Sequence, residues 1–317
     1  MKHLVIYNPN ASNGKAHKRL SAVRSQLDDL GIPHDLTLTE RPGHATVLAR
    51  ENADRYAVLV AAGGDGTVNE VINGIMLAQR TDTASQVSAL GVLGVGRGND
   101  FAHGAGVPGT LREACEVLKA GHRRRIDVGL VTGDGAPGGR YFGNGLGIGF
   151  DTIVSIEASK IAWAQGFVGY FIGAIKTIFF YYDPPELHLK TDNIDESRLL
   201  LQISAMIGQR MGGAFLMAPK ADSSDGLFDI CIAGEPSRRE MLGLVAKFLK
   251  GTQEGTRHIE FDRSSRLEVS SRAGKIVMHA DGETLCTAGH KAVVEIIPGG
   301  IEVISRKDTL PIHQNIG

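Results

Sequence analysis

Glycines surround an acid and a hydroxyl in the stretch GGDGT at residues 63–67. The stretch follows an apolar run at 56–61, which predicts a buried strand, and precedes apolar residues at helical spacing over 68–75. Such a turn brings backbone N–H groups close to a ligand, and a helix N-terminus favours an anion there. Asp65 would suit a magnesium-bound phosphate or a hydroxyl that must lose its proton. A tight turn in which Asp65 or Thr67 caps the helix is the simpler alternative.

Followed by Asn69 and Glu70, GGDGT resembles the nucleotide-binding signature of the diacylglycerol kinase catalytic family, which includes bacterial lipid kinases, sphingosine kinases and ceramide kinases. NAD kinases and phosphofructokinases share a similar GGDG core. A second stretch, GRGNDFA at 96–102, is similar to the family's other phosphate-side motif, usually written GTGNDFA. Arg97 replaces the usual threonine. A guanidinium donates more strongly to a phosphate but is bulkier than a hydroxyl, so the ATP contact at this position is open.

In a parallel sheet, ligands bind beyond the carboxyl ends of the strands. If the first part of the chain forms such a sheet, the loops at Asn8, Thr39 and Gly63 would meet there. The resemblance implies that these loops bind ATP. The residues expected there are Asn8, Lys15, Thr39, Gly63, Gly64, Asp65, Gly66, Thr67, Asn69, Glu70, Gly96, Arg97, Asn99 and Asp100. From the residues alone, Lys15 could equally be a solvated loop lysine, Thr39 a strand-end residue and Asp100 a helix cap.

Closely spaced acids occur in APKADSSDGLFD at 218–229. Carboxylates and carbonyls in a turn are ligands for hard cations, although Asp-Gly is also common in an ordinary β-turn. The stretch resembles the family's PxAxxxDGxxD segment, which holds a structural Mg²⁺. The resemblance implies that Asp225 supplies a carboxylate to this ion, Leu227 a backbone carbonyl, and Asp222 a further oxygen.

A last acidic turn, ADGE at 280–283, follows the predicted strand KIVMH. By itself it could be a hairpin turn. In the family a DGE at this place carries the proton acceptor, so the resemblance implies that Glu283 is the general base. Asp281 remains a competing candidate. Asp65 is a third, because sphingosine kinases are thought to use the acid of GGDG.

Apolar runs alternate with helical patterns in the first part of the chain. Strands are predicted at 4–7, 36–38, 56–61 and 90–95, and helices at 20–30, 45–53 and 110–120. This order predicts an α/β domain with a parallel sheet covered by helices. The resemblance implies a domain similar to NAD kinases and phosphofructokinases.

Short strands separated by turns dominate after Arg125, which predicts an antiparallel β-sandwich. They are expected at 186–191, 198–207, 227–233, 266–270, 275–280, 292–297 and 301–304. We therefore expect an α/β nucleotide-binding domain at 1–125 and a β-rich lipid-substrate domain at 126–304. The resemblance implies that the tail at 305–317 returns to the first domain.

One apolar stretch, 161–182, departs from the strand pattern. It is long enough to span a bilayer, and Gly169 with Gly173 forms a small-xxx-small pair. Gln165, Lys176 and several glycines dilute the run, and no second segment accompanies it. We expect a helix packed in the second domain, where it lines a lipid pocket, rather than a transmembrane span.

Composition limits the remaining function classes. A net charge of -1 argues against a nucleic-acid binder, and the three cysteines indicate a reducing compartment. The apolar run at 4–7 is too short for a signal peptide, so we expect a cytoplasmic protein whose lipid is presented at the inner face of the membrane. The histidines lack zinc-site spacing, and no GxSxG or GxxxxGK[ST] fingerprint occurs. The glycine clusters at 94–98 and 143–149 lack the GxGxxG spacing followed by an acid. Exposed sandwich edges often pair, which makes a homodimer one expectation.

Together these features predict a Mg²⁺-dependent kinase that transfers the γ-phosphate of ATP to a hydroxyl of a diacylglycerol-like lipid. Two alternatives stay open. One is a kinase for a soluble substrate, of the NAD kinase type, which would need neither GNDFA nor the late DGE. The other is a non-catalytic lipid or nucleotide sensor with the same fold. The sequence does not identify the lipid.

Overall fold

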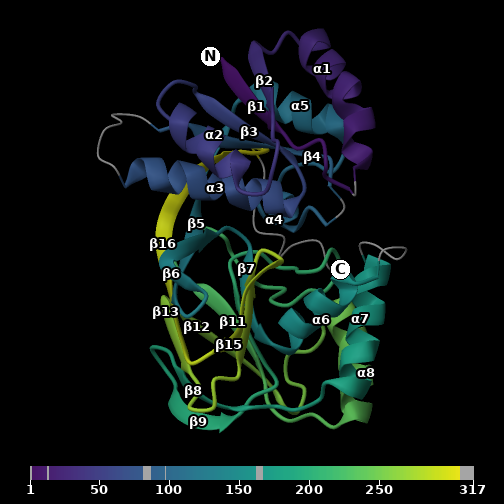
Figure 1. Cartoon of the computed structure of the whole chain (residues 1–317), viewed down its shortest axis with the longest axis vertical. Helices are drawn as coiled ribbons and strands as arrows, with labels where there is room; N and C mark the ends of the chain where they lie inside the picture. Colours follow the sequence, from purple (N-terminus) through teal and green to yellow (C-terminus); the bar gives the residue numbers. More distant parts are fainter. Residues whose placement is uncertain (1, 13, 81–86, 97, 162–166, 308–317) are drawn as a thin grey trace. The chain divides into compact units, whose positions relative to one another are not determined.

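The computed structural model describes residues 2–12, 14–80, 87–96, 98–161 and 167–307 (Figure 1). The chain forms two compact units. Unit 1 comprises Met1–Val128 and Pro298–Gly317, and unit 2 comprises Gly129–Ile297. Strands β5 (Arg123–Gly133) and β16 (Lys291–Ile304) each contain a unit boundary.

Unit 1 is built on parallel strands in the order β2-β1-β3-β4. Their bounds are β1 His3–Tyr7, β2 His34–Leu38, β3 Val58–Gly63 and β4 Ala89–Gly94. Val303 of β16 pairs with Leu90 of β4, also in parallel. β1 and β3 are buried throughout, which is why they are nearly continuous apolar runs. The predicted parallel α/β domain is confirmed.

Helices cover this sheet, with α2 packed on α3 and α1 on α5. Their bounds are η1 Lys15–Arg19, α1 Leu20–Asp29, α2 His44–Asn52, α3 Asp65–Gln79, α4 Asp100–Gly104 and α5 Leu111–Ala120. Because all the paired strands are parallel, the loops that follow β1, β2, β3 and β4 emerge at the same edge of the sheet.

Unit 2 contains an antiparallel six-stranded sheet in the order β12-β11-β10-β7-β14-β15. The bounds are β7 Gly145–Gly149, β10 Gln202–Met206, β11 Phe228–Ala233, β12 Ile259–Ser264, β14 Ile276–Ala280 and β15 Glu283–Gly289. A second antiparallel layer contains β6 Ala136–Phe142, β8 Glu186–Lys190, β9 Asp195–Leu199 and β13 Arg266–Ser270. Buried residues from both layers form one core, in which Phe142 and Phe228 stack with ring centroids 5.9 Å apart. The predicted β-sandwich is confirmed.

The strand predicted at 198–207 is wrong, because β9 and β10 belong to different layers. The chain crosses from one layer to the other at Leu200 and Leu201. The Leu200 amide donates to the carbonyl of Pro185, and the Leu201 amide donates to the carbonyl of Ala233. The stretch predicted as one strand thus contributes residues to two strands, one in each layer.

Three helices belong to unit 2: α6 Phe150–Ser159, α7 Phe167–Phe180 and α8 Arg238–Lys250. α7 falls within the helix predicted at 161–182, of which 162–166 lie outside the described residues. α6 and α8 were not predicted. α8 begins with a capping box in which the Ser237 hydroxyl accepts from the Glu240 amide while Glu240 accepts from the Ser237 amide. Within the described part of the chain, no helix is long and apolar enough to cross a membrane.

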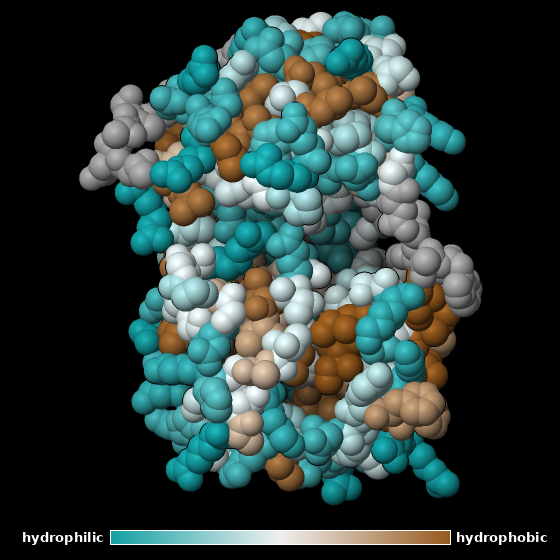
Figure 2. Space-filling model, viewed as in Figure 1, coloured by the Kyte–Doolittle hydropathy of each residue, from teal (hydrophilic) through white to brown (hydrophobic). Residues whose placement is uncertain are grey.

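The outer face of α7 exposes large apolar side chains, and Figure 2 shows apolar atoms along the α7 side of unit 2. The exposed residues of this helix and its C-terminal end are Phe167, Val168, Phe171, Phe179, Phe180 and Tyr181, with Phe180 76% exposed. We call this set the α7 apolar face. The opposite side of α7 is buried through Gly169, Gly173 and Ala174.

Candidate active site

Two glycine turns of unit 1 touch each other beyond the ends of β3 and β4. A Cβ atom on Gly96 would lie 2.4 Å from the Gly64 Cα, and one on Gly63 would lie 2.2 Å from the Thr67 Oγ1. Only glycine fits at either position. α3 starts directly after Gly64, with its N-terminal N–H groups at this point. The turns therefore form a backbone cradle of the kind that receives phosphate groups.

Asp65 lies between the two glycine turns. Its Oδ1 accepts a hydrogen bond of 3.3 Å from the Phe101 amide at the start of α4, and a Cβ on Gly98 would lie 2.7 Å from its Oδ2. This carboxylate thus ties the second turn to the first. α3 is capped by Gly64, without a side-chain hydrogen bond, so neither Asp65 nor Thr67 is the helix cap.

Asn8 joins the loop after β1 to the glycine turn. Its Nδ2 donates to the Thr67 Oγ1 at 2.9 Å, and its amide donates to the Ala62 carbonyl at 2.9 Å. Thr39 is buried at the end of β2, where its amide donates to the Tyr7 carbonyl. Lys15 is exposed at the start of η1. The structure therefore brings Asn8 and Thr67 into direct contact beside Asp65.

Glu70 links the start of α3 to the N-terminus of α2. Its Oε1 accepts from the Gly43 amide at 2.8 Å and its Oε2 from the Ala45 amide at 2.9 Å, at the N-terminus of α2. An anion there offsets the helix dipole and satisfies otherwise unpaired N–H groups. Asn69 is 1% exposed and accepts from the Asn73 amide side chain at 3.1 Å. Both side chains hold neighbouring elements in place.

In the second glycine turn, which follows β4, Arg97 lies outside the described residues. Asn99 caps α4 from a left-handed conformation with φ 51°, and Asp100 is a buried residue of the first turn of that helix. The alternative that Asp100 is the cap is therefore wrong: Asn99 takes that position.

In unit 2, Asp281 and Glu283 have different environments. The Asp281 carboxylate accepts three backbone hydrogen bonds, from Gly143 at 2.9 Å and from Asn144 and Gly145 at 3.0 Å each. Accepting a proton would weaken these bonds, so Asp281 is suited to fixing the turn. The Glu283 Oε2 lies 2.5 Å from the Arg140 guanidinium, with 38% of the glutamate side chain exposed. Of the two acids, Glu283 is therefore the better candidate for the general base.

The acidic loop at 218–229 is held by internal hydrogen bonds and by an arginine. The Asp222 Oδ1 accepts from the Ser224 amide at 3.0 Å, and the Asp225 Oδ1 accepts from the Leu227 amide at 3.0 Å. The other Asp225 oxygen pairs with Arg263. The described residues contain no cluster of three or more His, Cys, Asp or Glu side chains suited to a metal ion. The Mg²⁺ site at Asp222, Asp225 and Leu227 therefore stays a prediction.

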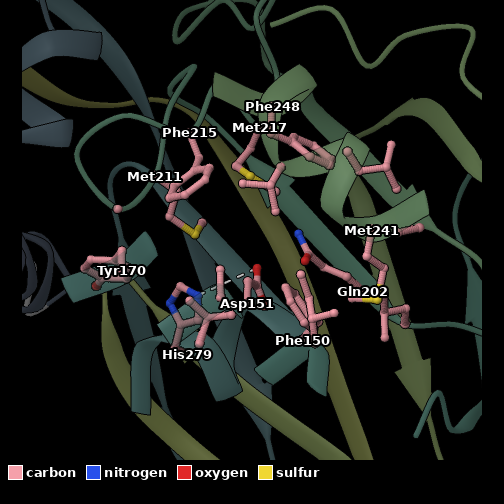
Figure 3. A pocket seen from close by; sticks show the side chains of 18 residues that line it. Phe150, Asp151, Tyr170, Gln202, Met211, Phe215, Met217, Met241, Phe248 and His279 are labelled. Carbon is pink, nitrogen blue, oxygen red and sulfur yellow. Dashed lines mark ion pairs between the residues drawn. The ribbon is translucent and has the colours of Figure 1, made fainter. Parts of the chain in front are cut away.

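A partly open apolar cavity lies in unit 2 (Figure 3). Its walls come from α6, α7, α8 and strands of the six-stranded sheet, and most of its lining is aliphatic, aromatic or methionine. Its lining is typical of a small-molecule site with few polar groups. The exceptions to the apolar lining are Asp151, Tyr170, Gln202 and His279.

Comparison with known proteins identifies the family. Residues 2–131 match the diacylglycerol kinase catalytic domain, and residues 144–305 match the YegS C-terminal NAD kinase beta sandwich-like domain. The chain is 30% identical over 288 residues to a diacylglycerol kinase of Staphylococcus saprophyticus, covering 88% of each protein. It belongs to the diacylglycerol kinase catalytic-domain family. Diacylglycerol kinases of Bacillus subtilis (29% identity, 88% of each protein) and Mycobacterium tuberculosis (27%, 96% of this chain and 94% of the relative) are further members.

Solved structures share the fold of this diacylglycerol kinase family member. A diacylglycerol kinase from Bacillus anthracis has a TM-score of 0.73 and 21% identity, covering 98% of both chains. Yeast NADH kinase complexed with NADH has a TM-score of 0.52 and 10% identity, covering 98% of this chain and 84% of that one. At these identities the likeness concerns the fold alone.

Sequence reasoning missed several residues of unit 2 in this member of the family. Arg140 pairs with Glu283 from a distant strand, and Asp151 and His279 face each other across 3.8 Å in the cavity. His279 stands two residues before Asp281, which was the only signal that could have drawn attention to it. The apolar run that contains α7 was the signal for the cavity itself.

Proposed function

We propose that this protein is an ATP-dependent lipid kinase that transfers the γ-phosphate of ATP to the hydroxyl of a diacylglycerol-like lipid. Its membership of the diacylglycerol kinase family supports the phosphoryl transfer. The observation that carries the lipid acceptor is the apolar cavity of unit 2, because an apolar lining favours a hydrocarbon chain over a nucleotide.

Unit 1 would hold the phosphates of ATP. The backbone N–H groups at the start of α3, and the close-packed turns of Gly63, Gly64 and Gly96, offer fixed donors that need no rearrangement when negative charge develops. These turns would be held in place by the hydrogen bonds of Asp65, Asn8 and Glu70. Mg²⁺, when bound with ATP, would offset charge on the phosphates.

Unit 2 would supply the proton acceptor. We assign this role to Glu283, whose orientation is fixed by Arg140, while Asp281 holds the turn through its three backbone hydrogen bonds. As the lipid oxygen bonds to the γ-phosphorus, its proton passes to the Glu283 carboxylate. The bond from the γ-phosphorus to the β,γ-bridging oxygen breaks, and ADP leaves.

The α7 apolar face would rest on the bilayer that contains the lipid. One side of this helix lines the cavity through Tyr170, Ala174 and Ile178. Its other side, the α7 apolar face, is exposed on the surface of unit 2. A helix of this kind lies in the interfacial region without spanning it. We therefore place the protein peripherally at the cytoplasmic face of the membrane.

Phosphate transfer from labelled ATP to a lipid panel in mixed micelles tests the proposal, with NAD⁺ as a soluble acceptor. Labelled lipid that disappears in Glu283→Gln, with ATP binding intact, is the expected result. Label in NADP⁺ would instead indicate a kinase of the NAD kinase type. ATP binding with no labelled acceptor would indicate a sensor. Full transfer by Glu283→Gln, with loss in Asp65→Asn, would move the base to Asp65.

A further inference from the structure

We propose that Arg140 binds the phosphate group of the phosphorylated lipid and takes it in exchange for the carboxylate of Glu283. This inference rests on the proposed function, because its ligand is the anion that forms when the lipid hydroxyl is phosphorylated. Arg140 and Glu283 lie on different strands of unit 2, with the Arg140 Nη2 2.5 Å from the Glu283 Oε2. The arginine therefore contacts the group that receives the proton in the reaction.

Arg140 lies on a hairpin that is fixed to β15, the strand that begins with the candidate base. β5 and β6 pair in antiparallel register (Figure 1). A Cβ on Gly135, in the turn between them, would lie 2.4 Å from the Leu285 carbonyl oxygen, so only glycine fits where this turn meets β15. The Asp134 carboxylate accepts from the His290 amide at 2.6 Å. The backbone that carries Arg140 is thus held by contacts other than the ion pair.

Glu283 follows a fixed turn and is partly exposed. The three backbone hydrogen bonds to Asp281 hold this turn, in which Asp281 has φ 46° and Gly282 has φ 82°. The side chains of Arg140 and Glu283 are 27% and 38% exposed. An ion pair with this exposure contributes little to stability, so its exchange for another ion pair costs little.

The proposed reaction removes the negative charge that Arg140 contacts. As the lipid oxygen bonds to the γ-phosphorus and the bond to the β,γ-bridging oxygen breaks, the hydroxyl proton passes to Glu283, which becomes neutral. Arg140 stays charged, because a guanidinium does not lose its proton in proteins. Since Glu283 must lie within hydrogen-bond range of the hydroxyl, the transferred phosphoryl group arrives beside the residue that Glu283 contacts. Its oxygens supply the negative charge that Glu283 has lost.

A guanidinium suits a phosphate better than it suits a neutral carboxylic acid. Its planar N–H donors can bind two oxygens of one phosphate, and hydrogen bonds between charged groups are stronger than those to neutral ones. A second ion pair of unit 2 gives a matched comparison. Arg198 on β9 and Glu260 on β12 also lie 2.5 Å apart, with 35% and 46% of their side chains exposed, but neither adjoins the DGE turn in sequence.

Binding of dioctanoyl phosphatidic acid without nucleotide tests this site apart from catalysis, by calorimetric titration of the full chain at neutral pH. Glu283→Gln resembles the protonated base. It should bind this product at least about tenfold more tightly than the wild type, the effect of a hydrogen bond between charged groups. Arg140→Met should weaken product binding and, combined with Glu283→Gln, should abolish the gain. Arg140→Met should leave the affinity for dioctanoylglycerol, which lacks the phosphate, unchanged.

The controls are Glu260→Gln and Arg198→Met, which should not change the affinity for the product. A folded Glu283→Gln that binds the product no better than the wild type would overturn the inference. A gain that persists in the double variant, an equal gain in Glu260→Gln, or failure of all these proteins to bind the product would do so too.

A second comparison does not depend on the folding of Glu283→Gln. Arg140→Lys keeps the positive charge and should retain most of the product affinity that Arg140→Met loses. Equal affinity of the wild type and Arg140→Met for the product would overturn the inference.

Phosphate transfer from ATP to dioctanoylglycerol is measured in parallel. Transfer by the wild type without the gain in Glu283→Gln would refute this inference and leave the kinase proposal standing. The gain without transfer to any lipid would leave Arg140 as a site for a lipid phosphate and would refute the kinase proposal.

Discussion

Glu157 is buried between two lysines, and its replacement by glutamine should loosen the packing of α6 against α7. Its Oε1 lies 2.5 Å from the Lys160 ammonium and its Oε2 lies 2.5 Å from that of Lys176, with 2% of its side chain exposed. The hydrogen bonds from Lys160 and Lys176 lower the pKa of Glu157 from 4.5 to about 2. This carboxylate joins the two helices that border the cavity.

The lowered pKa sets the size and pH dependence of the effect. A depression of about 2.5 units corresponds to about 3 kcal/mol at most. Since the lysine side chains are 57% and 44% exposed, solvent screening reduces this to about 1–2 kcal/mol. Because the pKa is lower in the folded protein, the stabilisation is complete above pH 4.5 and is lost as the pH falls toward 2.

Urea unfolding followed by circular dichroism at pH 7, 5 and 3 measures the difference between wild type and Glu157→Gln. The difference should be about 1–2 kcal/mol at pH 7 and 5 and smaller at pH 3. Glu116→Gln is the matched control, because Glu116 pairs with Arg112 on an exposed helix surface and should matter by less than about 0.5 kcal/mol. A difference that stays constant from pH 7 to 3, or that equals the control, would refute the reasoning.

Three further predictions concern the cavity, the membrane face and the nucleotide turn. Gly147→Ala should cost about 1–3 kcal/mol in urea unfolding because its Cβ meets Asp151, whereas Gly109→Ala, with open space around it, should be neutral; equal effects would contradict the cavity geometry. Phe180→Asp should reduce sedimentation with phospholipid vesicles several-fold more than Leu199→Asp, which changes another exposed apolar residue, on β9; equal loss would contradict docking through α7. Glu70→Gln should raise the KM for ATP without changing lipid binding, because one N–H at the start of α2 loses its acceptor; an unchanged KM would contradict its supporting role.

The sheet of unit 1 could be predicted because parallel strands buried on both faces are continuous apolar runs. β1 and β3 are buried at every residue, and the turn after β3 required glycine for close approach at Gly63. The contact between the loops of Asn8 and Thr67 could be predicted because β1 and β3 are parallel neighbours, so the loops after them emerge at the same edge of the sheet. The structural use of Glu70 could not be predicted, since its partners, the Gly43 and Ala45 amides, lie on another helix and follow no spacing rule.

Unit 2 was harder to predict because its strands and helices share similar apolar content. The stretch at 198–207 contributes to a strand in each layer, and only the tertiary hydrogen bonds of Leu200 and Leu201 show where one strand ends and the next begins. α8 carried a readable signal in its Ser237 and Glu240 capping box. The pairing of Asp225 with Arg263 could not be read from the acidic loop, because the arginine belongs to β12.

The central claim is tested most directly by incubating the protein with Mg²⁺, γ-labelled ATP and dioctanoylglycerol in mixed micelles, with Glu283→Gln as the control. We predict labelled phosphatidic acid from the wild type and at least a hundredfold less from a variant that still binds ATP, the upper range of general base catalysis being about 10⁴. Failure of the wild type to label any lipid, with transfer to NAD⁺ or to no acceptor, would contradict the account.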